Sequence, residues 1–267
     1  MSEKKRLDVL MTELGLAPSR AAAQALIMSG EVYIDGVKAI KAGQPVAEGI
    51  VPELRGGLKF VSRGGLKLEK ALDSFGVDPN GLNCIDCGAS TGGFTDCLLK
   101  RGASHVVSVD VGYGQLAWSL RNDERVTVME RTNVRHLTPD MLPYVPKLCV
   151  MDLSFISLSL VLPVIRTILD PTGQVCCLIK PQFEAGKEKV GKKGVVRDNE
   201  VRIEVLNNFL RYSGEAGFKC SGLDYSPVRG PEGNIEFLGW LTAPDGSDVI
   251  LDTRAVAEAA REALEKE

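Results

Sequence analysis

The sequence predicts an α/β fold in which a mostly parallel sheet of seven strands carries helices on both faces, preceded by a small α+β domain. From about residue 61 onward, strand-like and helix-like segments alternate repeatedly. Most of the strand-like segments are almost continuously apolar, as in parallel strands that are buried on both faces. Residues 1–60 follow a different pattern, so we expect domains at residues 1–60 and 61–267.

Length and composition fit this two-domain interpretation. The chain has 267 residues, with 44% hydrophobic and 25% charged residues, the profile of an ordinary globular protein. The N-terminus has no apolar stretch typical of a secretory signal peptide. The longest nearly uncharged run, residues 148–165, is interrupted by Asp152 and Pro163 and indicates a buried strand followed by a helix rather than a membrane span. We therefore expect a cytoplasmic protein.

The first domain is predicted to contain two short helices and a small sheet. Apolar residues at helical spacing predict a helix from Leu7 to Leu14, ended by Gly15. Ser19 is a good N-cap for a second helix that ends at Gly30. Residues 32–38 contain Asp35-Gly36 between short apolar runs, which predicts a hairpin. Residues 43–62 should hold the last strands and a linker.

The second domain is predicted from its order of strands and helices. A helix is expected through Phe94 and Leu98, another through Ile203, Leu206 and Leu210, and a surface helix from Asp252 to Glu267. The strands are predicted at residues 82–86, 105–110, 126–129, 148–152, 175–180, 218–225 and 235–241.

The cysteines and the charge distribution bear on possible ligands. The chain has seven cysteines, and Cys84 and Cys87 match C-x-x-C, with Cys176-Cys177 as a conceivable partner pair for zinc. We interpret them instead as reduced, apolar residues on central strands, and with two histidines we expect no metal. The net charge is −3, yet residues 1–70 hold 11 Lys/Arg against 8 Asp/Glu. This basic front suggests a polyanionic partner.

A glycine-rich turn follows the first long strand, in Asp86-Cys-Gly88-Ala-Ser-Thr-Gly92-Gly93. Such a turn lets a ligand approach the start of the next helix, and Asp110 at the end of the second strand can accept hydrogen bonds from ribose hydroxyls. Ser90 stands where a dinucleotide-binding motif has its second glycine, which argues against NAD. An acidic residue at position 86 suits a cationic ligand. The turn therefore predicts S-adenosylmethionine as the cofactor, with a purely structural turn as the alternative.

The whole chain resembles the TlyA family, which is often described as haemolysin and is understood as ribosomal RNA 2'-O-ribose methyltransferases. The front is similar to S4-type RNA-binding domains and the rest to FtsJ-like, Rossmann-like methyltransferases. The matching motifs are Ser19-Arg20-x-x-Ala23-x-x-Leu26-Ile27, Gly30-x-Val32-x-x-Asp35-Gly36, Val61-Ser-Arg-Gly-Gly-Leu-Lys67-Leu, Asp86-Cys-Gly-Ala-Ser-Thr-Gly-Gly-Phe94, Asp152-Leu-Ser-Phe-Ile-Ser157 and Ile179-Lys-Pro-Gln-Phe183.

The resemblance implies a catalytic tetrad of Lys67, Asp152, Lys180 and Glu236. Asp152 and Lys180 close the fourth and fifth strands, at the edge where open α/β sheets bind ligands. Glu236 reaches the same edge if the last strand is antiparallel, as the resemblance implies. We expect Lys180 to be the base that takes the ribose hydroxyl proton, with Lys67 and Asp152 setting its charge and orientation. Glu236 would position the ribose or Lys67.

The remaining expected contacts concern the cofactor and the RNA. The cofactor residues are Asp86, Gly88, Ala89, Ser90, Thr91, Gly92, Asp110, Asn133 and Asp152. The RNA contacts are Lys4, Lys5, Arg6, Ser19, Arg20, Lys38, Lys41 and Arg63. The expected partner is ribosomal RNA, with cytidine as the target nucleotide, or a ribosomal subunit.

Three questions stay open at this stage. Lys187, Lys189, Lys192 and Lys193 lie in a glycine-containing stretch that is either a solvated loop or a mobile segment touching RNA phosphate. The chain could also be an RNA-binding protein without catalytic activity, or a membrane-active haemolysin. The intact cofactor turn argues against the first alternative, and the acidic, alanine-rich C-terminal helix argues against the second. The oligomeric state is not predicted.

Overall fold

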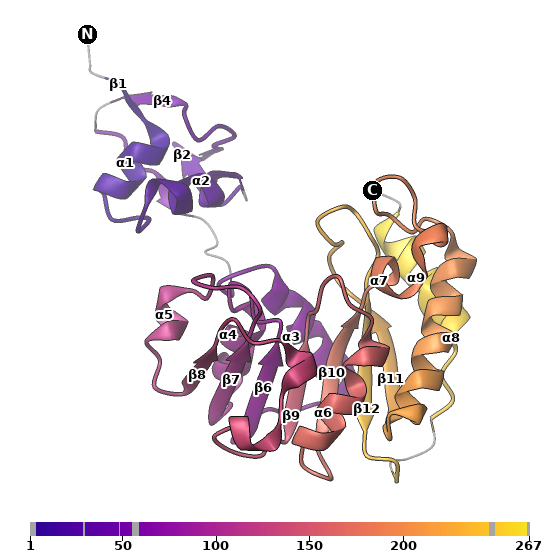
Figure 1. The fold of residues 1–267 in the computed structure, drawn as a ribbon. Coiled ribbons are helices and arrows are strands. Elements are labelled where there is room, and N and C mark those ends of the chain that lie inside the picture. Colours follow the sequence, from indigo (N-terminus) through magenta and orange to yellow (C-terminus); the bar gives the residue numbers. More distant parts are fainter. Residues whose placement is uncertain (1–3, 29, 48, 55–58, 246–248, 266–267) are drawn as a thin grey trace. The chain divides into compact units, whose positions relative to one another are not determined.

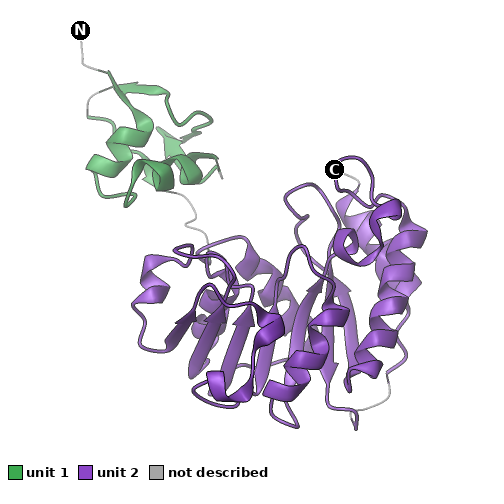
Figure 2. Cartoon of the chain, in the orientation of Figure 1, with its two compact units in different colours: residues 1–59 green, residues 60–267 purple. Residues whose placement is uncertain are grey.

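The computed structural model describes residues 4–28, 30–47, 49–54, 59–245 and 249–265. It divides into two compact units, residues 1–59 and 60–267 (Figures 1 and 2). Part of the predicted linker, residues 55–58, and the last two residues of the predicted C-terminal helix, 266–267, lie outside the described residues. Each unit has its own core.

The first unit contains the predicted helices and hairpin around a small core that includes Leu7, Met11 and Ile27. Ser19 Oγ accepts a hydrogen bond from the backbone N–H of Ala22 at 3.2 Å, which confirms it as the N-cap. Its elements are β1 (Lys4–Arg6), α1 (Leu7–Glu13), α2 (Arg20–Met28), β2 (Val32–Ile34), β3 (Val37–Lys38), β4 (Pro45–Ala47) and β5 (Glu53–Leu54). Strands pair in the orders β3-β2-β5 and β1-β4.

The hairpin of the first unit is also confirmed. Strands β2 and β3 pair antiparallel, and the two residues between them, Asp35 and Gly36, have φ values of 49° and 80°. Positive φ at both central positions is the geometry of a type I′ turn, which Asp-Gly favours.

The second unit is built on a seven-stranded sheet in the order β11-β12-β10-β9-β6-β7-β8 (Figure 1). Strand β12 runs antiparallel to both neighbours, while the pairs among β6 to β10 are parallel. The predicted mostly parallel sheet with an antiparallel last strand is therefore confirmed. The strands are β6 (Asn83–Cys87), β7 (His105–Val109), β8 (Val126–Met129), β9 (Leu148–Met151), β10 (Gln174–Ile179), β11 (Lys219–Tyr225) and β12 (Phe237–Thr242).

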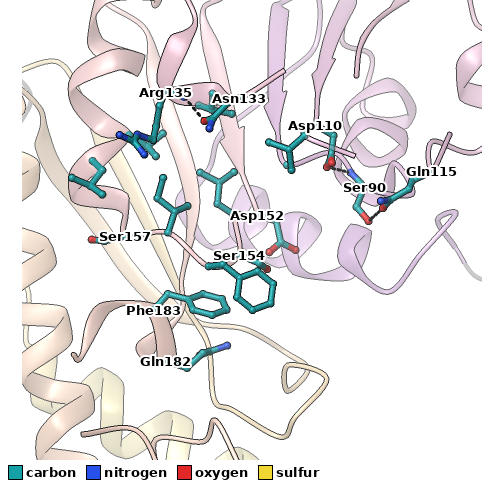
Figure 3. Close-up of a pocket in the computed structure, with 18 of the residues that line it drawn as sticks. Ser90, Asp110, Gln115, Asn133, Arg135, Asp152, Ser154, Ser157, Gln182 and Phe183 are labelled. Atoms are coloured by element: carbon teal, nitrogen blue, oxygen red, sulfur yellow. Dashed lines mark hydrogen bonds between the residues drawn. The ribbon is translucent and has the colours of Figure 1, made fainter. Parts of the chain in front are cut away.

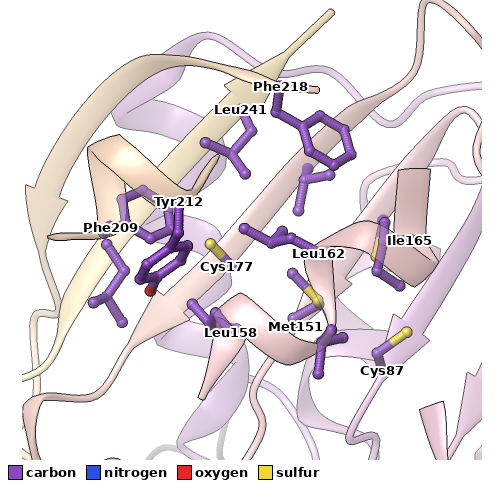
Figure 4. Close-up of a cluster of buried hydrophobic side chains, with 14 of the residues drawn as sticks. Cys87, Met151, Leu158, Leu162, Ile165, Cys177, Phe209, Tyr212, Phe218 and Leu241 are labelled. Carbon is purple, nitrogen blue, oxygen red and sulfur yellow. The ribbon is translucent and has the colours of Figure 1, made fainter. Parts of the chain in front are cut away.

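Helices cover both faces of this sheet, and each face has a separate apolar core. One core includes Met151, Leu162 and Phe209 (Figure 4), and the other includes Leu68, Leu98 and Leu178. The helices are α3 (Gly64–Phe75), α4 (Gly93–Lys100), α5 (Trp118–Arg121), α6 (Leu162–Ile168), α7 (Pro181–Glu184), α8 (Asn199–Glu215) and α9 (Thr253–Leu264). Although α9 was expected at the surface, Ala257 and Ala260 on one of its faces are fully buried.

The cysteines belong to these cores. Cys84 and Cys87 lie on β6 but face opposite sides of the sheet, one in each core. Cys176 and Cys177 are likewise free and buried on β10. The prediction that these four cysteines are apolar residues on central strands is confirmed. No helix in the described part of the chain is long and apolar enough to cross a membrane.

Candidate active site

The glycine turn between β6 and α4 is held close to the end of β9. Gly88 has φ +89°, and a Cβ atom there would lie 2.7 Å from the backbone carbonyl oxygen of Asp152. A side chain at position 88 would therefore be strained and would collide with backbone. The turn and Asp152 are packed against each other because position 88 is glycine.

Asp110 follows β7 and organises the loops on both sides of the turn. One of its carboxylate oxygens accepts a hydrogen bond from the N–H of Ser90 at 2.8 Å, and the other accepts one from the N–H of Gly112 at 2.6 Å. Ser90 itself has φ +48°. The carboxylate thus fixes the turn and remains at the rim of a cavity, where it can also accept hydrogen bonds from a ligand.

A pocket of about 960 Å³ opens at this carboxyl edge of the sheet (Figure 3). Its size and mixed apolar and polar lining fit a nucleoside-sized ligand. Five predicted cofactor residues line it. They are Gly88, Ser90, Asp110, Asn133 and Asp152.

A second pocket of about 280 Å³ adjoins the first and shares Gly88, Ser90, Asp152 and Ser154 with it. The two cavities therefore have a common wall. The second pocket is lined by two more predicted cofactor residues, two predicted catalytic residues and one predicted RNA contact. These are Ala89, Thr91, Lys67, Lys180 and Arg63.

The four predicted catalytic residues, Lys180, Asp152, Lys67 and Glu236, form a row of alternating positive and negative charges, which we call the charged chain. Lys180 Nζ lies 2.5 Å from Asp152 Oδ1 and donates to Ser154 Oγ at 3.0 Å. Lys67 Nζ donates to Glu236 Oε2 at 2.6 Å and lies 3.9 Å from Asp152 Oδ2. The lysines and Glu236 are buried and Asp152 is partly exposed, so most of this charge is withdrawn from bulk solvent. The antiparallel β12 brings Glu236, from far along the chain, to the other three.

Two predicted cofactor residues do not line either pocket. Gly92 faces Leu116 and Leu120 and serves the packing of α4. Asp86 is fully buried beneath the turn, where one carboxylate oxygen accepts a hydrogen bond from Thr95 Oγ1 at 2.7 Å. Burial raises the pKa of Asp86 to about 7, and the hydrogen bond from Thr95 opposes this shift. Both residues support the turn from below.

Sequence reasoning missed Glu184, which joins the segments that follow β9 and β10. Its carboxylate accepts hydrogen bonds from Ser157 Oγ at 2.7 Å, from the N–H of Leu158 at 2.9 Å and from the hydroxyl of Tyr212 at 3.2 Å. Burial raises the pKa of Glu184. The residues next to Glu184 in the sequence do not indicate this role, because its hydrogen-bond partners are distant in the chain.

The predicted RNA contacts of the first unit fall into two groups. Lys4, Lys38 and Lys41 are exposed. Arg6 and Arg20 form ion pairs with the buried Asp8, and Lys5 pairs with Glu13. The hydrogen bond from Arg6 holds the pKa of Asp8 well below its ordinary value. Ser19 caps α2. Several of the predicted RNA contacts therefore also stabilise the first unit itself.

Comparisons with known proteins agree with this geometry. The family model for FtsJ-like methyltransferases matches residues 60–243, and the S4 domain model matches residues 5–49. The chain is 51% identical over 91% of its length to a Bacillus subtilis protein named as a candidate rRNA methyltransferase, 87% of which is covered. It is 44% identical to the 16S/23S rRNA (cytidine-2'-O)-methyltransferase TlyA of Mycobacterium tuberculosis, covering 99% of this chain and 98% of that protein.

A solved structure of a protein named as a hemolysin from Streptococcus thermophilus is also similar. Its sequence identity is 43% and the TM-score is 0.79, with 100% of this chain and 98% of that chain covered. The fold and the site define an enzyme that uses S-adenosylmethionine to transfer methyl groups. Within that class, the chain belongs to the TlyA family, in which an S4 domain precedes an FtsJ-like methyltransferase domain.

Proposed function

We propose that this protein transfers a methyl group from S-adenosylmethionine to the 2'-hydroxyl of a cytidine in ribosomal RNA, in the cytoplasm, acting on the RNA or on a ribosomal subunit. The names of the similar proteins support the substrate. The observation that carries the proposal is the position of the charged chain. Asp152 borders both pockets, and Lys67 and Lys180 line the smaller one. A donor in the larger pocket and a ribose in the smaller one would meet across this wall.

The proposed roles follow from these positions. Bound S-adenosylmethionine supplies a methyl group on a positively charged sulfur. Lys180, in its neutral form, takes the proton from the 2'-hydroxyl, because a ribose hydroxyl is too weak an acid to attack unaided. Asp152 holds the Lys180 ammonium in place before and after this step, and Ser154 fixes its direction. Much of the rate should come from in-line alignment of the two reacting groups.

The other two residues support that arrangement. Lys67 is held by Glu236 and faces the second oxygen of Asp152. It therefore connects Glu236 to Asp152, so that the carboxylate facing Lys180 is held between two lysines. We assign Glu236 to positioning Lys67. For the cofactor we assign Gly88, Ala89, Ser90, Thr91, Asp110, Asn133 and Asp152 as contacts, with Asp86 and Gly92 supporting the turn.

The decisive experiment is methylation with radiolabelled S-adenosylmethionine, using purified ribosomal RNA and intact ribosomal subunits as separate substrates. We expect the label in RNA, on a cytidine whose 3'-phosphodiester resists alkaline cleavage because its 2'-oxygen is blocked. Label on a base atom, or no transfer to any of these substrates, would contradict the proposal. A liposome-leakage assay on the same preparation tests the haemolysin alternative.

A further inference from the structure

A tight turn between β10 and α8 presents two adjacent lysines. The N–H of Gly194 donates to the carbonyl of Gly191 at 2.8 Å, and the N–H of Gly191 donates to the carbonyl of Val195 at 3.2 Å. Lys192 and Lys193 occupy the tip between these bonds, and both side chains are exposed. Within the part of the chain that the structure describes, neither has an ion-pair partner. The tip therefore carries two uncompensated positive charges on a closed turn.

The turn forms one side of a separate concavity of about 300 Å³. Lys189 and Arg197 flank it on either side of the turn. Lys189 is neutralised by Glu204, at 2.5 Å, whereas Arg197 is exposed and has no ion-pair partner among the described residues. The one carboxylate in the lining, Asp198, accepts a hydrogen bond from the N–H of Glu200 as the N-cap of α8. We call the concavity formed by Lys189, Lys192, Lys193 and Arg197 the basic cradle.

The buried side-chain amide of Asn234 links the basic cradle to the segment that carries Glu236. Asn234 accepts a hydrogen bond from the N–H of Val196 at 2.9 Å and donates one to the carbonyl of Gly194 at 2.8 Å. Only 1% of its surface is exposed. Asn234 stands two residues before Glu236, which holds Lys67. The backbone of the turn is therefore tied to the segment that carries Glu236, although the two lysines at its tip are exposed.

The same loop also reaches the cofactor pocket at its other end. Lys187 lines the larger pocket, two residues before the first lysine of the cradle. One short segment of the chain therefore borders both the larger pocket and the separate concavity. A charge run of this kind on a mobile loop would be ordinary solvated surface, but here the backbone of the turn is hydrogen-bonded to a buried residue.

We infer that the basic cradle is a second RNA contact, which binds backbone phosphates of the substrate near the modified nucleotide. The inference rests on the proposed function, because it takes RNA as the substrate. Lys192, Lys193 and Arg197 have no ion-pair partner among the described residues and stand on a hydrogen-bonded turn. Such a group attracts a phosphodiester by charge, with release of counterions and without reading sequence. It supplies the catalytic unit with an RNA contact of its own, independent of the S4 domain.

The test compares full-length proteins for binding to purified ribosomal RNA across a series of salt concentrations. The variant Lys192→Ala/Lys193→Ala should weaken binding at low salt by about tenfold and reduce the slope of log K against log salt by about 1.5, as expected for two lost phosphate contacts. The variant Lys192→Arg/Lys193→Arg should retain the slope. A control with the same change in net charge is Lys147→Ala/Arg211→Ala. It removes the exposed Lys147, which directly precedes β9, and the exposed Arg211 of α8, which pairs with Glu215, and it should leave the slope unchanged.

Several outcomes discriminate between the possibilities. An unchanged slope in Lys192→Ala/Lys193→Ala overturns the inference and leaves a solvated loop, whether or not the wild type methylates RNA. An equal loss in the control overturns it too, since the effect would then be general charge. If the wild type binds RNA through these lysines but transfers no methyl group, the cradle stands and the proposed function fails. S-adenosylmethionine affinity, measured by calorimetry, should be the same in all variants.

Discussion

Asp152 is the residue on which the active site converges. Its backbone carbonyl contacts the glycine turn, and its two carboxylate oxygens face different lysines, Lys180 and Lys67. It also lines both pockets. A single side chain thus connects the cofactor turn to the proposed base, because β9 lies at the centre of the sheet beside β6 and β10.

The assignment of Lys180 as the base predicts a specific defect in Lys180→Arg. Arginine keeps the positive charge next to Asp152 but does not become neutral at working pH. We expect cofactor and RNA binding to persist while single-turnover methyl transfer falls by about two to four orders of magnitude. The control is Lys70→Arg, which changes a lysine on the same helix as Lys67 that pairs with Asp224 outside the tetrad. Near-normal transfer by Lys180→Arg would exclude the role.

Asp86 predicts a pH dependence of stability. Because folding raises its pKa to about 7, the fold favours the protonated carboxyl, and this stabilisation is lost as pH rises from about 4 to 7. In the cofactor-free protein, Asp86→Asn should become more stable than wild type over that range, by up to about 4 kcal/mol, and the difference should stay constant above pH 8. Urea unfolding at several pH values measures it. A difference that does not vary with pH would contradict the prediction.

Two short connections, one after β9 and one after β10, together form much of the pocket wall. The first carries Ser154 and Phe155, and the second carries Phe183, whose ring centroid lies 5.1 Å from that of Phe155. Glu184 at the end of α7 bonds both to the first connection and to Tyr212 of α8. The wall is therefore braced by a helix that lies outside the site.

This brace predicts that Glu184→Gln slows catalysis more than it affects folding. The amide keeps the size of the side chain, but its nitrogen cannot accept the hydrogen bonds from Ser157 and Tyr212. We expect the turnover rate to fall about tenfold, because small displacements of positioning groups are costly. The Michaelis constant for RNA and the melting temperature should change little. Tyr212→Phe removes one of the three bonds and should have a smaller effect. A large loss of stability without a specific fall in turnover would indicate a purely structural role.

The molecule as a whole combines a catalytic unit with a separate small unit, each with its own core. Some of the positive charges of the first unit are paired within the unit, since Arg6 and Arg20 form ion pairs with the buried Asp8. The exposed Lys4, Lys38 and Lys41 remain as candidates for phosphate contact. The division suggests that RNA affinity and chemistry are separable.

Neutralising these three lysines tests that separation. In Lys4→Ala/Lys38→Ala/Lys41→Ala we expect weaker binding to purified ribosomal RNA and a salt slope reduced by about 2, because three phosphate contacts are lost. The affinity for S-adenosylmethionine should stay at the wild-type value. Filter binding at four salt concentrations and calorimetry measure the two quantities. If RNA binding and its salt slope match the wild type, the first unit does not supply these contacts.

Local patterns in the sequence were sufficient for the strands of the sheet, for several helices and for the glycine turn of the candidate site. The Asp35-Gly36 hairpin, the Ser19 cap and the apolar strands follow from short-range preferences of the backbone and from burial on both faces. The glycine turn and Asp110 follow from the order of strands, since ligands bind at the carboxyl ends of parallel strands. The tetrad came from a family resemblance, and residue patterns alone placed only Asp152 and Lys180 at one edge.

The tertiary structure decided which polar groups meet. It placed Asp86 beneath the turn rather than in a pocket, and it made Glu184 a bridge between loops and Asn234 an anchor for the basic cradle. The partners of Glu184 and Asn234 lie about 25 to 40 residues away in the chain, and Lys67 and Glu236 are 169 residues apart. Hydrogen bonds and ion pairs act over a few ångströms, so the way in which strands and loops pack determines which groups become partners. The periodicity of the sequence does not predict these pairs.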